Sequence, residues 1–259
     1  MSFPDINGKL TEKLIKSVII PPKSKIVLSD KSYQIKILGI NYLDQIMELH
    51  QLIIDRLIRK DTLEPFTTEF MKEHLGNKGF IIGADYGKKL IAFRNVYFPD
   101  INEKEWNLGI DLGFDESILH KVANLQMVCV HPVYRGNSLA LIMNGNAIRI
   151  IKSLGKYDHI CATVSPYNYW NLRILFDSGF VVKKLTTKYN GKLRYIVHRN
   201  LKETQRFDPV CHESVVLTDF TKQYELLNKG WYGTGLIINN ESAGPNSYEK
   251  MLFVFCKQT

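Results

Sequence analysis

The sequence of 259 residues lacks long apolar runs. Charged or polar residues interrupt every candidate, including the segment from Leu14 to Ile20, so no stretch reaches the roughly 18 residues that a membrane helix needs. The first residues, Met1 to Asp5, have neither the basic start nor the apolar core of a signal peptide. These absences predict a cytoplasmic protein without a membrane partner.

Patterns that bind metals or form disulfides are also missing. The seven histidines show no H-x-x-x-H or H-E-x-x-H spacing, and the four cysteines show no C-x-x-C spacing. Three of the cysteines lie in apolar, strand-like runs, where a reduced thiol packs as a small hydrophobic side chain. We therefore predict no metal site, and we favour buried thiols over disulfides or metal ligands. The cysteines are Cys129, Cys161, Cys211 and Cys256.

Acidic residues are absent from one basic stretch. Seven lysines and arginines lie between Lys183 and Lys202 without a single Asp or Glu, in a chain of net charge +8. We favour the solvated face of a hairpin as its explanation. The alternative is nucleic-acid binding, which would want more interleaved aromatic residues than Tyr189 and Tyr195. We expect no nucleic-acid partner.

The order of the predicted elements indicates an α/β fold. Turn residues separate runs with the period of a helix from runs with the alternation or continuous apolar character of a strand. The predicted helices are residues 10–18, 43–57, 67–76, 116–122, 139–154, 168–178 and 219–228. The predicted strands are residues 33–38, 80–85, 90–98, 125–130, 160–164, 180–182, 193–197, 215–217 and 251–256.

The stretch from Leu125 to Ala140 organises the chain. A buried strand ends at His131-Pro132, crosses the Arg135-Gly136 turn and enters the helix of residues 139–154. The first backbone N–H groups of a helix have no partner within the helix, and they lie at the positive end of its dipole. This turn therefore predicts an anion-binding site.

The residues of this stretch carry a family resemblance. V-C-V-H-P-V-Y-R-G-N-S-L-A, from Val128 to Ala140, resembles the acyl-CoA signature of the GNAT superfamily of N-acetyltransferases. Asn168, followed by Gly179-Phe180, is similar to the second motif of that family. The resemblance covers about Tyr33 to Leu201. It implies a mixed central sheet whose parallel central strands splay apart and are flanked by helices.

The extent of this resemblance, together with the patterns before and after it, divides the chain. We expect an N-terminal arm in residues 1–30, an acyltransferase domain in residues 31–202, and an α/β extension in residues 203–259 that packs on it. By the same resemblance, acetyl-CoA or another acyl-CoA is the co-substrate. Its expected contacts include strand backbone for the pantetheine arm and N–H groups with one cation for the pyrophosphate. These residues are Val128, Val130, Arg135, Gly136, Asn137, Ser138, Leu139, Ala140 and Asn168.

Two positions depart from the family pattern. Ser138 replaces the first glycine of the signature, which still leaves a backbone N–H, and its hydroxyl can add a phosphate contact. Leu175 replaces the tyrosine that protonates the leaving thiolate in many members, and leucine cannot donate a proton. Tyr169 or Tyr167 then substitutes for it, or the thiolate leaves with help from solvent.

The acceptor amine must be neutral to attack, so a group must take its proton. Asp111 is our candidate, because it lies in an apolar, glycine-flanked segment just before the strand of residues 125–130. A loop-capping role for Asp111 is as well supported. With Tyr169 as the acid, this completes the expected catalytic pair.

The predicted function is an N-acyltransferase that moves acetyl from acetyl-CoA to a primary amine by direct attack in a ternary complex. The alternative is a catalytically idle acyl-CoA sensor or scaffold of the same fold. The family meets its acceptor, a small molecule or a peptide, through segments that correspond here to residues 47–75, 106–115 and 187–194. The basic hairpin favours acidic groups on the acceptor, and the sequence leaves a homodimer open.

Overall fold

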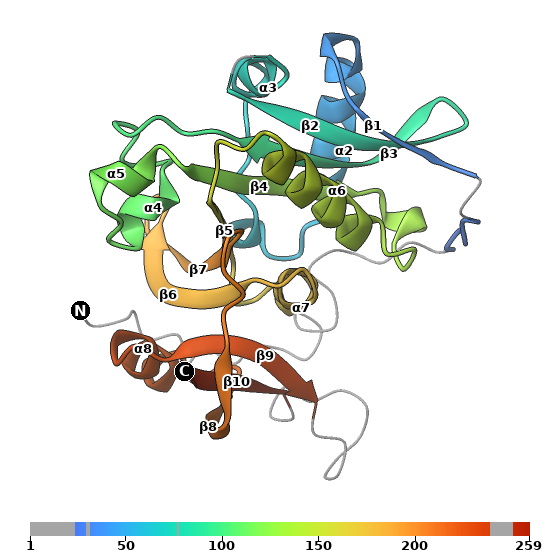
Figure 1. The fold of residues 1–259 in the computed structure, drawn as a ribbon. Helices are drawn as coiled ribbons and strands as arrows, with labels where there is room; N and C mark the ends of the chain where they lie inside the picture. Colours follow the sequence, from blue (N-terminus) through green and yellow to red (C-terminus); the bar gives the residue numbers. More distant parts are fainter. Residues whose placement is uncertain (1–23, 30–31, 77, 239–250) are drawn as a thin grey trace.

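The computed structural model describes residues 24–29, 32–76, 78–238 and 251–259 (Figure 1). The helix predicted for residues 10–18, and most of the expected arm, lie outside them. The strands are β1 (Gln34–Ile37), β2 (Gly79–Tyr86), β3 (Lys89–Tyr97), β4 (Val122–Val130), β5 (His159–Val164), β6 (Val181–Lys188), β7 (Lys192–Asn200), β8 (Phe207–Val216), β9 (Tyr232–Ile238) and β10 (Met251–Gln258).

Helices connect and cover these strands, and every helix among the described residues is too short or too polar to span a membrane. The α-helices are α2 (Leu43–Arg56), α3 (Thr68–His74), α4 (Leu108–Asp111), α5 (Glu116–Leu119), α6 (Leu139–Ser153), α7 (Tyr169–Asp177) and α8 (Phe220–Asn228). The 3-10 turns are η1 (Ile40–Tyr42), η2 (Lys60–Thr62) and η3 (Pro132–Tyr134).

The strands form one sheet in the order β1-β2-β3-β4-β5-β7-β6-β9-β10-β8. Its first half has a helix layer on each face, with α6 on one side and α2 on the other (Figure 1). Successive side chains of β2 and β3 point to opposite faces of the sheet. Ile82 and Ala92 pack in the core with α6, whereas Ile81 and Phe93 pack with α2.

The two parallel strands at the centre splay apart. β4 pairs with β5 only from Val122 opposite His159 to Asn124 opposite Cys161. Beyond Asn124, β4 continues beside β3 to Val130, while β5 follows β7 to Val164. The α/β fold with a mixed sheet and splayed parallel strands, predicted from the sequence, is confirmed.

The C-terminal strands extend this sheet, with α8 packed beside them (Figure 1). β6 meets β9 where Val182 faces Gly233, and Phe253 of β10 packs edge-on against Tyr195 of β7 at 5.4 Å. Strand β9 is missing from the sequence prediction, because Gly233 and Gly235 weaken its strand pattern. The strand predicted for residues 215–217 is the end of the longer β8.

The basic stretch is less solvated than the sequence suggests. Lys188 forms an ion pair with Asp111, Lys192 with Glu64, and Lys202 with Asp158. Arg194 is buried. Part of this charge is therefore paired with carboxylates or buried. All four cysteines are free thiols, and Cys129, Cys161 and Cys256 are buried, as the sequence predicts.

Candidate functional site

A cavity of about 710 Å³ opens where β4 and β5 separate. Its walls include the β4 residues from Asn124 to Val128 and Val130, β5 residues Thr163 and Val164, and the first turns of α6 and α7. The splay creates this space, because strands that stayed paired would fill it with their own hydrogen bonds. The edge of β4 that faces the cavity is free to pair with an extended ligand.

Unsatisfied polar groups surround the cavity. The side-chain oxygens of Asn124, Gln126 and Asn171 are buried and have no hydrogen-bond partner among the described residues, and all three residues line the cavity. Leaving a buried acceptor without a partner costs about 1–3 kcal/mol. A ligand with amide N–H groups, such as a pantetheine arm, would satisfy them, so the residues present fit an acyl-CoA.

The turn before α6 has the geometry of an anion site. Gly136 and Ser138 both adopt left-handed backbone angles, with φ of 91° and 53°. The backbone N–H groups from Gly136 to Leu141 donate to no described residue. The Ser138 hydroxyl makes no cap hydrogen bond, so it too is available. Ser138 thus adopts a left-handed conformation, which glycine, the residue at this position of the family signature, adopts with less strain.

Most of the predicted cofactor residues meet at the cavity. Val128, Val130, Arg135, Gly136, Ser138, Leu139, Ala140 and Asn168 all line it. Arg135 folds back so that its Nε donates to the carbonyl oxygen of Val130 at 3.3 Å, and burial lowers the pKa of its guanidinium. Asn168 caps α7, because its Oδ1 accepts from the N–H of Asn171 at 3.2 Å.

Asn137 is the exception among these residues. It does not line the cavity, and its side chain holds the segment before β1. Its Oδ1 accepts from the N–H of Leu28, and its Nδ2 donates to the carbonyl oxygens of Ile26 and Tyr134, each at 2.8–2.9 Å. Lys25, in the same segment, lines the cavity and adds a cation.

The structure does not bring the predicted catalytic pair to the cavity. Asp111 ends α4 away from the lining, and its carboxylate accepts from Lys188 at 2.6 Å. Tyr169 is buried in the main core beside Trp170, and Tyr167 is also outside the lining. Leu175 is buried in the same core. These residues are close to the motif in the sequence, but none of them lines the cavity.

Another set of cavity residues escaped the sequence prediction. Glu64, Trp106, Tyr189 and Arg194 all line the cavity. They come from the three segments that the resemblance assigned to the acceptor, but nothing in the local pattern separates them from their neighbours. Glu64 accepts from Lys192 at 2.5 Å. Burial raises the pKa of Tyr189, whose hydroxyl lies 3.2 Å from the Thr163 hydroxyl.

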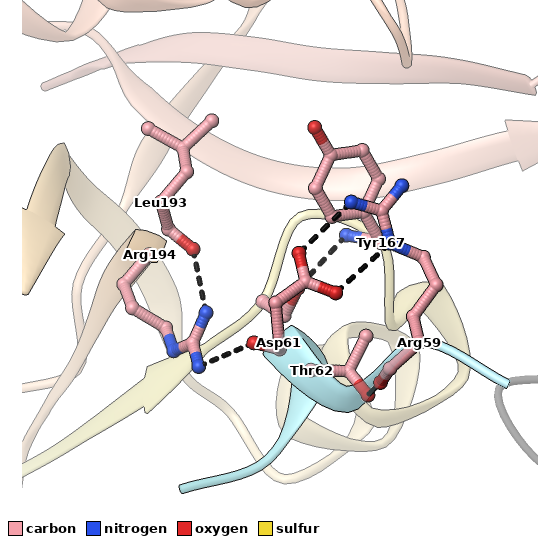
Figure 2. Close-up of polar contacts among 7 residues, drawn as sticks. Arg59, Asp61, Thr62, Tyr167, Leu193 and Arg194 are labelled. Carbon is pink, nitrogen blue, oxygen red and sulfur yellow. Dashed lines mark hydrogen bonds and ion pairs between the residues drawn. The ribbon is translucent and has the colours of Figure 1, made fainter. Parts of the chain in front are cut away.

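A polar network anchors η2 beside this part of the cavity (Figure 2). Arg59 pairs with Asp61 through two hydrogen bonds of 3.0 and 2.8 Å and lies over the ring of Tyr167 at 3.6 Å. Arg194 reaches from β7 and donates to the carbonyl oxygens of Asp61 and Leu193 at 2.7 and 2.8 Å. Tyr167, which does not line the cavity, is thus held against Arg59.

No group of three or more metal-ligating side chains occurs in the part of the chain that the structure describes. The cavity residues can supply backbone hydrogen bonds, the carboxylates of Glu64 and Asp177, several cations, and hydroxyl groups such as those of Tyr189 and Thr163. Such a set suits acyl transfer to an amine, where hydrogen bonds position the thioester and a carboxylate takes a proton.

Comparison with solved structures identifies the fold, whereas no protein-family model and no curated protein matches the sequence. The GNAT-family acetyltransferase from Streptococcus pneumoniae aligns at a TM-score of 0.50 and 12% identity, over 65% of this chain and 98% of its own. The Arabidopsis thaliana NAA60 structure, in complex with acetyl-CoA, aligns at 0.51 and 13%, over 66% and 99%. The putative acetyltransferase yncA from Salmonella typhimurium, with acetyl-CoA, aligns at 0.50 and 14%, over 67% and 96%. The chain therefore has the fold of the GNAT-family acetyltransferases, as the motif from Val128 to Ala140 predicts.

Proposed function

We propose that the protein is an acyl-CoA-dependent N-acyltransferase that moves acetyl from acetyl-CoA to a primary amine. The observation that carries the proposal is the open edge of β4 beside the free N–H groups at the start of α6. The solved structures of the Arabidopsis and Salmonella neighbours contain acetyl-CoA, which supports the same co-substrate here.

The N–H groups from Gly136 to Ala140 would bind the pyrophosphate, with Arg135 as the nearby cation. The backbone of Val128 and Val130 would pair with the pantetheine amides, as a neighbouring strand does. Asn168 would act through its cap, which fixes the start of α7 at the cavity wall. Asn137 would contribute its backbone N–H while its side chain holds the turn in place.

The transfer would proceed by direct attack in a ternary complex. The amine nitrogen forms a bond to the thioester carbonyl carbon, the carbon–sulfur bond breaks, and the pair of electrons leaves on the thiolate. The amine proton goes to a carboxylate, and Glu64 replaces Asp111 as our candidate because it lines the cavity. A thiolate is a good leaving group near neutral pH, so solvent can protonate it without Tyr169.

The assay is the release of free thiol from acetyl-CoA with a panel of primary amines, together with mass spectrometry of the amine. We expect thiol release that depends on both the amine and the enzyme, and an acetylated product. Binding of acetyl-CoA without thiol release for any amine would instead support the idle sensor.

A matched pair of glycine variants locates the site. Gly136 and Gly155 lie before and after α6, both with positive φ and with open space where a Cβ would lie. Valine strains the backbone at either position, but only Gly136→Val disturbs the proposed phosphate site. We expect Gly136→Val to weaken acetyl-CoA binding at least 10-fold, and Gly155→Val to leave it unchanged.

A further inference from the structure

Arg194 is a buried cation at the wall of the cavity. It is 3% exposed and lines the cavity from the start of β7, just beyond the last β5–β7 pair, Val164 with Tyr195. A charged side chain is rarely buried to this extent unless a partner of opposite charge is present.

No carboxylate of the described residues forms a direct ion pair with Arg194, although those of Asp61 and Glu64 lie nearby. Its two hydrogen bonds go to the neutral carbonyl oxygens of Leu193 and Asp61 (Figure 2). The Asp61 carboxylate pairs with Arg59 at 2.8 Å, and the Glu64 carboxylate pairs with Lys192 at 2.5 Å. Two of the five N–H donors of the guanidinium are therefore used, and three are left for a ligand.

The surroundings restrict which ligand fits. The ring of Tyr189 lies 5.7 Å from the Arg194 guanidinium and 6.0 Å from the ring of Trp106. Glu64 also lines the cavity, and burial lowers the pKa of Arg194 while the nearby Tyr189, Asp61 and Glu64 partly offset that effect. A cation and a carboxylate lining one cavity complement a molecule that carries both a carboxylate and an amine. The rings of Tyr189 and Trp106 add aromatic surface to the same lining.

We propose that the acceptor is a small amine with its own carboxylate, as in an α-amino acid, and that Arg194 binds this carboxylate. The inference rests on the proposed N-acyl transfer and names its substrate class. The planar guanidinium can hold a carboxylate by two parallel hydrogen bonds. Such binding would leave the amine to face Glu64 and the thioester.

The experiment compares the standard α-amino acids with amines that have the same side chain but no carboxylate. Initial rates of thiol release from acetyl-CoA give kcat and KM for each pair. For the preferred amino acid we expect kcat/KM to exceed that of its amine by about 10- to 100-fold, the range of a charge-assisted hydrogen-bond pair. Arg194→Met should remove this preference by raising KM for the amino acid alone, with acetyl-CoA binding unchanged.

Two further variants separate binding from folding. Arg199→Met is the matched control, because Arg199 is on the same strand and also donates to a backbone oxygen, that of Ser178, but does not line the cavity. It should keep the preference. Arg194→Lys keeps the positive charge but lacks the two parallel N–H donors of the guanidinium. It should keep part of the preference for the amino acid over its amine, even if Arg194→Met loses stability.

Equal rates for amino acids and amines in the wild type would overturn the inference. Better transfer to peptide amino termini than to free amino acids would also overturn it, as would equal losses for both members of a pair in Arg194→Met. All of these outcomes leave N-acyl transfer intact. The absence of transfer to any amine, with acetyl-CoA bound, would instead reject the proposed function itself.

Discussion

Glu64 is the residue on which the proposed chemistry depends most. Both Glu64 and Asp111 pair with a lysine, but only Glu64 lines the cavity. We expect Glu64→Gln to lower kcat about 100-fold or more at neutral pH, because the amine then loses its proton acceptor. Acetyl-CoA binding should not change. Steady-state rates at saturating acetyl-CoA measure the effect.

Asp111→Asn is the control for this prediction. It removes a carboxylate of the same chemistry from outside the cavity, so turnover near neutral pH should stay within a few-fold of the wild type. If instead Asp111→Asn abolishes turnover and Glu64→Gln does not, the base predicted from the sequence is correct and our replacement is wrong.

His198 makes stability depend on pH. Burial, with the nearby Lys183 and His159, lowers the pKa of His198 to about 3 from the usual 6.5. The native state therefore holds a neutral ring, and the unfolded state takes up a proton first as the pH falls. The contribution of the neutral His198 ring to the unfolding free energy is therefore fully present above pH 6.5. It is lost as the pH falls from 6.5 to 3, at up to about 1.4 kcal/mol per pH unit.

The measurement is the urea unfolding free energy from pH 7 to pH 4. We expect the unfolding free energy of His198→Gln to depend less steeply on pH than that of the wild type. The difference should be up to about 1.4 kcal/mol per pH unit, which corresponds to one proton, because glutamine does not titrate. His120→Gln is the control, because His120 is exposed. Equal slopes for the wild type and both variants would contradict the assignment.

At the scale of elements, the start of α6 is the part of the sequence motif that forms the proposed phosphate site. Ser138 holds a φ of 53°, which glycine adopts with less strain. We expect Ser138→Gly to raise the unfolding free energy by about 0.5–1 kcal/mol and to keep acetyl-CoA affinity. Ser138→Val should lower both. Thermal melts and calorimetric titration test this, and loss of affinity in Ser138→Gly would show that the hydroxyl itself is needed.

How far the sequence predicts an element depends on whether its signal is local. Strand β4, the turn at Gly136 and helix α6 were predictable, because apolar pattern and motif lie within one stretch. Strand β9 was not, because Gly233 and Gly235 interrupt its pattern and only pairing with β10 stabilises it. Glu64 and Arg194 were equally hidden. They reach the cavity from segments far apart in the chain, and the spacing of residues within one segment does not predict which distant segments meet.

At the scale of the whole molecule, the C-terminal strands and the rest of the sheet share one core. Phe253 packs with Tyr195 and Phe176, and Gly233 allows β9 to approach β6. A Cβ at Gly233 would lie 2.4 Å from the Phe253 ring and 3.0 Å from the Cβ of Val182. Gly233→Val should therefore lower the unfolding free energy by about 3 kcal/mol through overpacking.

Gly235 provides the matched control on the same strand, because a Cβ there meets nothing within 4 Å. Gly235→Val should change the unfolding free energy by no more than about 0.5 kcal/mol. Denaturant unfolding of both variants tests the packing. Equal effects of the two substitutions would show that β9 does not pack against β6 as described.

A crystal structure of the protein with acetyl-CoA would test most directly the claim that β4 and the start of α6 bind this co-substrate. We expect the pyrophosphate at the N–H groups from Gly136 to Ala140. We expect the pantetheine arm along β4 between Leu125 and Val130, within hydrogen-bond distance of its backbone, and the acetyl group in the cavity. Acetyl-CoA bound elsewhere, or a saturated crystal with β4 still unpaired and the α6 turn empty, would contradict it.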